Sequence, residues 1–198
     1  MIIVGPSQSG KTVWCKRLIQ CSEEVFDRPV NKIYWYYGIW NPGLREFQEA
    51  QRKRKNPQQV FVREGMPQSM SEIEPDSIVV LDDLLQGDFT EMFTKWTHHI
   101  PCCCIKISQN YYFKPKDRTA NINAQYIVLF KYPGDKLLIQ MLARQMKKPW
   151  LTAAYEEATR KPYSYLLIDL NQTTPDDIRI RSQILPGEGL IEVYKGKK

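Results

Sequence analysis

The residues best suited to chemistry stand at the start of the chain, in the octapeptide GPSQSGKT. It fits the pattern G-x-x-x-x-G-K-[ST], whose glycines let the backbone curl until several N–H groups point at phosphate oxygens. Lys11 can reach the β- and γ-phosphates of a nucleotide, and the Thr12 hydroxyl can bind Mg²⁺. An apolar strand before the motif and a helix after it are the context that the pattern requires. We therefore predict that a phosphate-binding loop is formed by Gly5, Pro6, Ser7, Gln8, Ser9, Gly10, Lys11, Thr12 and Val13.

Two aspartates are placed to complete a metal and water site. Asp82 and Asp83 directly follow the apolar run Ile78 to Leu81, which predicts a buried strand ending in two carboxylates. Asp82 would hold Mg²⁺, through water, and Asp83 would orient or deprotonate an attacking water. A second acid at this place is typical of ATPases that activate water, although many of them carry a glutamate there.

An amide and two arginines are further candidates. The segment IKISQN ends a strand that we expect to lie between the phosphate-loop strand and the acidic strand. Gln109 at its tip is therefore expected to sense the γ-phosphate, with Asn110 as the alternative. An arginine from a neighbouring subunit often stabilises the transferred phosphoryl group in ATPase rings. Arg118, in a polar loop, and Arg144, at the edge of an apolar helix arc, could serve, although each could equally be an ordinary surface arginine.

Strands and helices alternate along the sequence, and the strands are apolar throughout. This pattern predicts an α/β domain whose mostly parallel central sheet has helices on both faces. In the helix expected at 134–146, Leu137, Leu138, Met141 and Leu142 form the apolar face. The strands are expected near 1–4, 32–38, 59–64, 76–85, 102–110, 125–131 and 164–170, and the other helices near 11–22, 42–56, 88–98 and 149–160.

Size and composition narrow the class of protein. The 198 residues suggest one domain, with a core at 1–170 and a C-terminal extension at 171–198 that packs on the core or on a neighbouring subunit. The net charge of +6 is compatible with a polyanionic partner. No run approaches the roughly 18 apolar residues of a membrane span, and no basic segment marks a secretory signal. Five cysteines, three of them consecutive, fit a reducing compartment better than a disulfide framework.

Three weaker signals have plainer explanations. HHIPCCC (98–104) contains zinc-binding residue types, but adjacent cysteines on a strand point to opposite faces, which favours a core role. The basic run RKRK (52–55) could contact DNA phosphates, although a solvated helix end is the more ordinary interpretation. The aromatic residues of YWYYGIW are more consistent with a core strand than with base stacking.

Longer blocks carry a family resemblance over nearly the whole chain. In order, the sequence contains GPSQSGKT, IVVLDDLL, SQNYYF, RTANINAQYIVLFKYPGD, LARQM and YLLIDLNQTTPDDIRIRSQILPGE. Together they resemble the FtsK/HerA-type genome-packaging ATPases of polinton (Maverick) elements, adintoviruses and related small double-stranded DNA viruses. The middle and C-terminal blocks are the specific part, because the two nucleotide motifs occur in many ATPases.

The resemblance implies a P-loop NTPase fold of the additional-strand (ASCE/RecA-like) type. It implies a homo-oligomeric ring, with ATP and Mg²⁺ bound between subunits, that pumps double-stranded DNA into a preformed capsid. It assigns the loop role to Lys11 and Thr12, the acidic role to Asp82 and Asp83, and the sensor role to Gln109, and it places Arg118 and Arg144 in basic motifs. The expected location is the viral factory, the host nucleus or cytoplasm, or the virion. Many relatives carry chain before the loop, so we expect either that part of a subunit interface or capsid-docking region is missing from this sequence, or that the element uses a minimal motor.

Two other functions fit the same loop. A nucleotide or small-molecule kinase would need an acceptor pocket and an arginine-rich lid, and Asp83 would then have no task. A non-catalytic capsid assembly factor would bind ATP without turnover. A GTPase is disfavoured, because the nearest string to the N-K-x-D guanine motif is NKIY, which lacks the aspartate.

Overall fold

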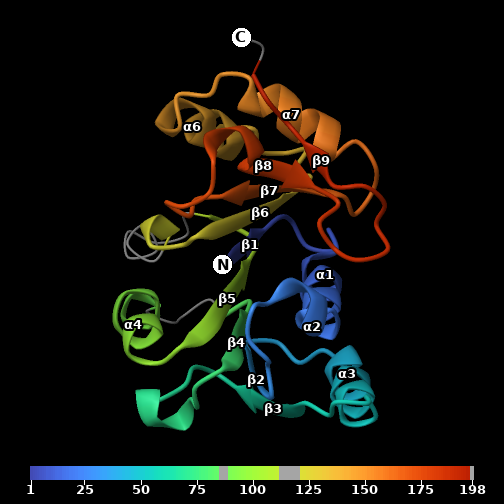
Figure 1. Cartoon of the computed structure of the whole chain (residues 1–198), viewed down its shortest axis with the longest axis vertical. Helices are drawn as coiled ribbons and strands as arrows, with labels where there is room; N and C mark the ends of the chain where they lie inside the picture. Colours follow the sequence, from blue (N-terminus) through green and yellow to red (C-terminus); the bar gives the residue numbers. More distant parts are fainter. Residues whose placement is uncertain (85–88, 112–120, 197–198) are drawn as a thin grey trace.

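A nine-stranded sheet forms the centre of the molecule, with strand order β3-β2-β4-β5-β1-β6-β7-β8-β9 (Figure 1). The computed structural model describes residues 1–84, 89–111 and 121–196. Neighbouring strands from β3 to β6 are parallel, whereas β7, β8 and β9 each run antiparallel to the strand before them. The predicted mostly parallel sheet is confirmed, and its antiparallel end is an addition. The strands are β1 (Ile2–Val4), β2 (Lys32–Tyr37), β3 (Gln59–Glu64), β4 (Ser77–Asp82), β5 (Cys102–Ser108), β6 (Tyr126–Phe130), β7 (Tyr165–Asp169), β8 (Ile180–Ser182) and β9 (Glu192–Val193).

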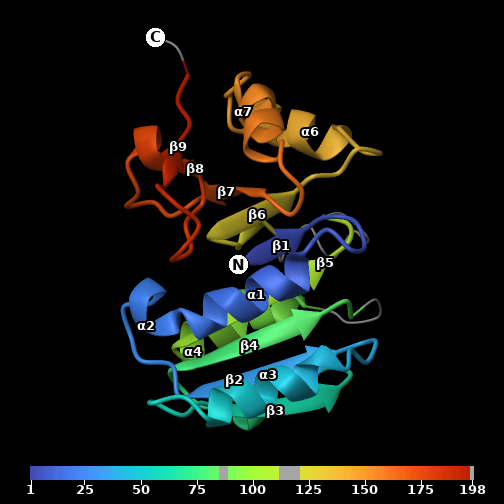
Figure 2. The same ribbon diagram turned by 90° about the vertical axis from the view of Figure 1, so that its right-hand side faces the viewer.

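Helices cover both faces of the sheet (Figures 1 and 2). Alternate residues of each strand point to opposite faces, so Ile3 packs with Trp14 of α1, while Ile2 packs with Ile139 of α6. One face is covered by α1 (Lys11–Gln20), α2 (Ser22–Val25) and α3 (Gly43–Arg52). The other is covered by a π-helical turn (Met92–Trp96), α4 (Thr97–His99), α6 (Leu137–Gln145) and α7 (Leu151–Ala158). Within the described part of the chain, no helix is both long and apolar enough to cross a membrane.

The strand β5 separates β1 from β4, which is the arrangement of the additional-strand class. Val4 of β1 pairs with Ser108 of β5, and Asp82 of β4 pairs with Ile107 of β5. The three parallel strands therefore end at the same level. The loops that follow them begin at one edge of the sheet, which we call the carboxyl edge.

The apolar face predicted for α6 is partly wrong. Leu142 is buried as predicted, and Leu138 and Met141 pack against the core from partly buried positions. Leu137, however, is 75% exposed, and Ile139 and Ala143 are buried in the core instead. The run LLIQMLA offers two overlapping apolar arcs, and packing against α7 in the same core cluster selects the arc that contains Ile139. The helix also starts later than expected, because the backbone N–H of Leu137 donates to Oδ1 of Asp135 at 2.8 Å.

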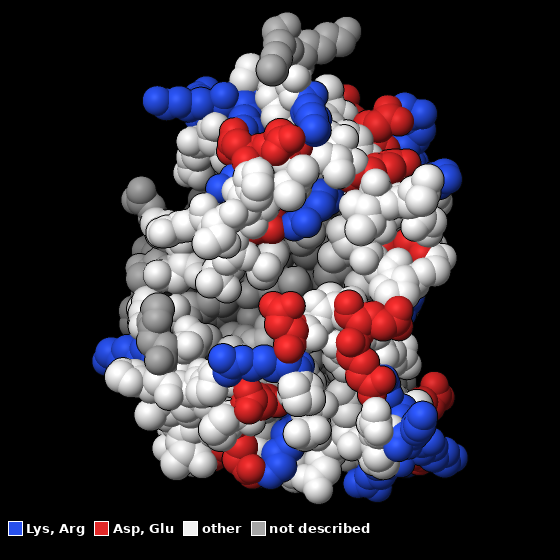
Figure 3. Space-filling view, viewed as in Figure 1, with Lys and Arg blue, Asp and Glu red and all other residues white. Residues whose placement is uncertain are grey.

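Surface charges are mixed on the face that Figure 3 shows, where basic and acidic side chains are interspersed. The basic run at 52–55 begins at the last residue of α3. Within it, Arg54 donates to the backbone oxygen of Gln20 at 2.6 Å and to Oε1 of Gln51 at 3.2 Å. Arg54 therefore caps the C-terminal end of α1 and links it to α3. This structural role supports the interpretation of the run as an ordinary helix end.

A buried carboxylate fixes the turn that reverses the chain after β7. Asp169, at the end of β7, is only 3% exposed. Its Oδ1 accepts the backbone N–H of Asn171 at 3.0 Å, and its Oδ2 accepts the hydroxyl of Thr174 at 3.0 Å and the guanidinium of Arg181. A carboxylate removed from water needs such partners to stay charged.

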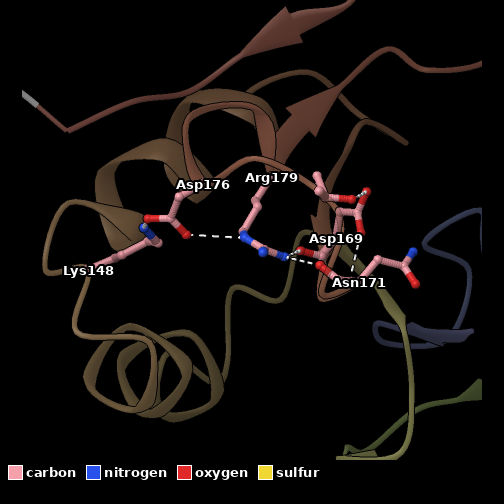
Figure 4. Close-up of polar contacts among 6 residues, drawn as sticks. Lys148, Asp169, Asn171, Asp176 and Arg179 are labelled. Atoms are coloured by element: carbon pink, nitrogen blue, oxygen red, sulfur yellow. Dashed lines mark hydrogen bonds and ion pairs between the residues drawn. The ribbon is translucent and has the colours of Figure 1, made fainter.

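Arg179 closes the same turn from the other side (Figure 4). One guanidinium nitrogen donates to the backbone oxygens of Asp169 and Asn171 at 3.1 and 2.6 Å, and Nε donates to Asp176 at 3.1 Å. Asp176 in turn pairs with Lys148, between α6 and α7, at 2.6 Å. The network joins β7, β8 and the helical layer.

Removing the buried carboxylate should therefore destabilise the domain strongly. We expect Asp169→Ala to lower the free energy of unfolding by about 3–5 kcal/mol, because it leaves the Arg181 charge half-buried without its partner. Glu156→Ala, which removes an exposed pair with Lys136, is the control and should cost less than about 1 kcal/mol. Urea unfolding measures both, and equal losses in the two variants would refute the anchoring role.

Candidate active site

The phosphate loop connects β1 to α1 at the carboxyl edge. Gly10, the residue before α1, has φ of 100°, a conformation that favours glycine. Gly5 is equally constrained, because a β-carbon there would lie 2.7 Å from Cβ of Phe130. The backbone N–H of Ser9 donates to the oxygen of Pro6 at 3.3 Å and closes the curl. The two glycines of the motif are thus required by the geometry of the loop.

Lys11 lies across the mouth of this curl. Its side-chain nitrogen donates to the backbone oxygens of Gly5 and Pro6, both at 2.7 Å, and the residue is only 6% exposed. Burial lowers the pKa of Lys11, and the nearby charges of Asp83 and Asp82 oppose that shift. The Lys11 ammonium group, held by two backbone carbonyls and largely shielded from water, is well placed to turn towards phosphate oxygens.

Asp82 ends β4 in a largely buried position beside the loop. The indole Nε1 of Trp35 donates to its Oδ2 at 3.3 Å. Burial, followed by the neighbouring charge of Asp83, raises the pKa of Asp82 to about 6, although Lys11 and Lys16 act in the opposite direction. A nearby cation would favour the carboxylate form of such a group.

Asp83 and Gln109 meet across the gap between β4 and β5. The side-chain nitrogen of Gln109 donates to Oδ2 of Asp83 at 3.0 Å. Asp83 itself has φ of 49°, and its backbone N–H donates to the oxygen of Ile107 at 3.2 Å. The loop after β2 supports this turn, because a β-carbon on Gly38 would lie 2.5 Å from the backbone oxygen of Asp83. The backbone of Asp83 is therefore fixed by β5 and by the loop after β2, and its side chain is held by Gln109.

The chemistry of these residues fits a magnesium nucleotide. Among the described residues, no group of three or more His, Cys, Asp or Glu could hold a metal ion without help. Mg²⁺ is usually bound by one or two carboxylates together with phosphate oxygens, so Thr12 and Asp82 would suffice once a nucleotide is present. The hydroxyl of Ser9 is buried and has no hydrogen-bond partner within the described part of the chain. A phosphate oxygen would supply the acceptor that this hydroxyl lacks.

A cavity of about 630 Å³ opens on the loop, large enough for a nucleotide. The loop contributes residues 8–13, and the exposed side chain of Val13 is among them. Trp14 and Arg17 of α1 also line it. Three further residues of its wall come from separate parts of the chain, and no local motif marks them: Asn41, Tyr163 and Glu188.

The two predicted arginines have different outcomes. Arg144 lines a second cavity of about 330 Å³ together with Gln109 and Asn110 of its own chain. It therefore lies on the face of β5 that is turned away from α1. Its action on a neighbouring subunit remains a prediction. Arg118 lies outside the described residues.

The cysteines behave as core residues. All five are free, and burial raises the pKa of the Cys103 and Cys104 thiols, which keeps both protonated. The described residues offer no zinc cluster, and the side chain of His98 lies outside the described part. Cys104 is buried in the core, and Cys102 and Cys103 pack against it from partly buried positions, which is the core role expected for HHIPCCC.

Comparison with known proteins defines the fold. Neither a protein-family model nor a curated protein sequence matches this chain. The chain is similar in structure to the genome packaging NTPase B204 from Sulfolobus turreted icosahedral virus 2 in complex with ATP-gammaS, with a TM-score of 0.52 and 14% identity. It is also similar to B204, the DNA-packaging ATPase from Sulfolobus turreted icosahedral virus, with a TM-score of 0.53 and 12% identity. Each match covers 100% of this chain and 97% of the other. The predicted P-loop NTPase fold is confirmed.

The raised pKa of Asp82 predicts a pH-dependent cost to stability. Above about pH 6 the folded state holds a buried negative charge on Asp82. As the pH falls below about 6, Asp82 is protonated in the folded state before it is protonated in the unfolded state, where its pKa is 3.8. We expect Asp82→Asn, which removes the charge, to raise the free energy of unfolding by about 1–3 kcal/mol at about pH 7.5, and the gain should vanish near pH 4.

Urea unfolding of the nucleotide-free protein across this pH range measures the effect. Asp76→Asn is the control, because it makes the same substitution at an exposed aspartate directly before β4. A gain for Asp82→Asn that does not change with pH would contradict the assignment of the cost to its charge.

Proposed function

We propose that this protein is an ATP-hydrolysing motor that packages viral double-stranded DNA into a preformed capsid. The observation that carries the proposal is the convergence of Lys11, Asp82, Asp83 and Gln109 at the carboxyl edge, with β5 between β1 and β4. The two similar structures support it, because one is a genome packaging NTPase and the other a DNA-packaging ATPase. The resemblance to the enzymes of polinton and adintovirus-like elements narrows the proposal to that lineage.

The chain's own residues suggest how hydrolysis would proceed. Lys11 would leave the carbonyls of Gly5 and Pro6 and bind β- and γ-phosphate oxygens. Asp83, held by Gln109, would accept a hydrogen bond from water and take its proton as the water oxygen bonds to the γ-phosphorus. The bond between that phosphorus and its bridging oxygen breaks, ADP carries the electron pair away, and the proton returns to solvent. Mg²⁺, held by Thr12 and Asp82, would neutralise phosphate charge.

The hydrogen bond between Gln109 and Asp83 favours hydrolysis over transfer to another acceptor. A kinase would leave Asp83 without a task, yet this side chain is aimed by an amide from the next strand. A passive assembly factor would likewise have no use for an oriented base. The contact therefore supports an ATPase, although it says nothing of DNA.

The motor proposal adds partners and an assembly. A homo-oligomeric ring, hexameric by resemblance, would place Arg118 or Arg144 of one subunit against the nucleotide of the next. Double-stranded DNA would pass through the centre, and capsid proteins would hold the ring. The protein would act in the viral factory, in the host nucleus or cytoplasm, or on the virion.

The proposal predicts ATP hydrolysis that DNA stimulates. We expect Lys11→Ala and Asp83→Ala to lower the rate at least about a hundredfold, because they remove the phosphate cation and the base. Lys136→Ala, at an exposed surface pair, is the control and should keep wild-type activity. Phosphate release is measured with and without duplex DNA. Equal rates in both conditions would argue against a motor, and phosphate transfer to a nucleoside would favour a kinase.

A substitution at Gly38 tests the position of Asp83 without altering a side chain that we assign to nucleotide binding or catalysis. In Gly38→Ala the new methyl group would push the backbone of Asp83, so kcat should fall about ten- to a hundredfold while ATP affinity is kept. Gly134→Ala is the matched control, because its methyl group would meet Tyr132 only at 3.9 Å. Steady-state kinetics and thermal unfolding of both variants separate a displaced base from a general loss of stability. Unchanged kcat in Gly38→Ala would show that the Asp83 backbone position is not critical.

A further inference from the structure

Tyr163 is a large aromatic residue that does not belong to the hydrophobic core. It lies in the loop between α7 and β7, it is 71% exposed, and its backbone has φ of 63°. Its Cδ1 and Cβ lie only 3.3 and 3.5 Å from the point where a β-carbon on Gly10 would sit. An exposed ring in a conformation that side chains rarely adopt, set against the phosphate loop, calls for an explanation beyond packing.

The antiparallel end of the sheet brings this tyrosine to the loop. Phe130, the last residue of β6, pairs with Tyr165, the first residue of β7. Because β7 runs in the opposite direction to β6, the segment before β7 reaches the carboxyl edge. The strand β8 reverses again, so the segment after Ser182 returns to the same edge. Two segments distant from the motif in sequence therefore flank the phosphate loop.

The second of these segments contributes Glu188 to the wall of the cavity and is anchored by several hydrogen bonds. Oε1 of Glu188 accepts a guanidinium N–H of Arg17 in α1 at 3.2 Å, and its Oε2 accepts the hydroxyl of Tyr165. The backbone N–H of Leu185 also donates to Oε2, at 3.1 Å, and Arg17 donates to the oxygen of Pro186 at 3.3 Å. These contacts clamp residues 185–188 onto the helix that begins at the phosphate loop.

The cavity of about 630 Å³ is continuous from the phosphate loop to both segments. A triphosphate in the loop would leave its nucleoside in the space between Tyr163 and Glu188. An aromatic ring offers a nucleobase a flat surface on which to stack, and such stacking needs no particular base edge. The available volume, the exposed ring and the anchored Glu188 in the same cavity wall fit a pocket for a planar group.

We propose that Tyr163 is the stacking platform for the purine base of the bound nucleotide, in a pocket that the segment 185–188 closes. The inference rests on the proposed function, since it requires that the loop binds a nucleoside triphosphate. It assigns to Tyr163 a role in binding the base and none in the reaction. The affinity for ATP then depends on a residue more than 140 positions from the motif.

The test compares a ligand that has a base with one that has none. In Tyr163→Ala we expect the affinity for ATP to fall at least about tenfold, while the affinity for inorganic tripolyphosphate stays the same. Tyr163→Phe should keep the wild-type affinity for ATP, because it retains the ring. Alanine and tyrosine carry the same cost at a positive φ, so the first variant changes the ring and leaves the backbone demand as it was. Isothermal titration calorimetry with each ligand and Mg²⁺ gives these values.

Controls distinguish a failure of the stacking role from a failure of the proposed function. Leu190→Ala removes an apolar side chain that is 89% exposed on the same C-terminal segment, and it should change neither affinity. If Tyr163→Ala leaves ATP binding intact, or weakens ATP and tripolyphosphate equally, the stacking role is overturned while nucleotide binding stands. If the wild-type protein binds neither ligand, the proposed function itself fails.

Discussion

The site depends on one constraint, the register that ends three parallel strands at the same level. Hydrogen bonding sets Val4 of β1 opposite Ser108 of β5 and Asp82 of β4 opposite Ile107 of β5. The chain must leave the sheet after each of these residues, and there the phosphate loop, the paired aspartates and Gln109 begin. A shift of one residue in any strand would turn its side chains to the other face and remove its loop from the edge. The buried, near-continuous apolar strands fix the register, so the core determines the chemistry.

The same edge carries local costs that the rest of the fold must offset. Asp82 is held charged in a site that raises its pKa to about 6, and Lys11 is desolvated in a site that lowers its own. Asp83 and Gln8 adopt left-handed backbone conformations without being glycine, with φ of 49° and 63°. Such features persist only where the surrounding structure determines them strongly, and they gather at functional sites. Here they gather around the space that a magnesium nucleotide would occupy, whose charges would relieve the electrostatic part of the cost.

The sequence predicted what is encoded locally. GPSQSGKT and the run before Asp82 are continuous segments in which strand, turn and side-chain chemistry are adjacent, so the loop and the aspartates could be located without coordinates. Gln109 needed one further step, the expectation that its strand lies between the other two. The core face of α6 could be predicted only in part, because LLIQMLA supports two overlapping apolar arcs and only packing against α7 selects the one that contains Ile139 and leaves Leu137 exposed. Tyr163 and Glu188 could not be found either, since their relation to the loop exists only through the reversed directions of β7 and β8.

The parallel and antiparallel parts of the sheet thus bring different groups to the carboxyl edge. Its parallel part gathers the groups that we propose bind phosphate and orient water, because parallel strands deliver all their following loops to one edge. Its antiparallel end delivers both a preceding segment, with Tyr163, and a following segment, with Glu188, to that edge. Arg17 ties the second segment to α1, whose first residue is Lys11. A ligand that spans loop and pocket would touch both parts of the sheet at once. Its binding would therefore be sensitive to any movement of the C-terminal strands relative to α1, and the buried network around Asp169 holds those strands in place.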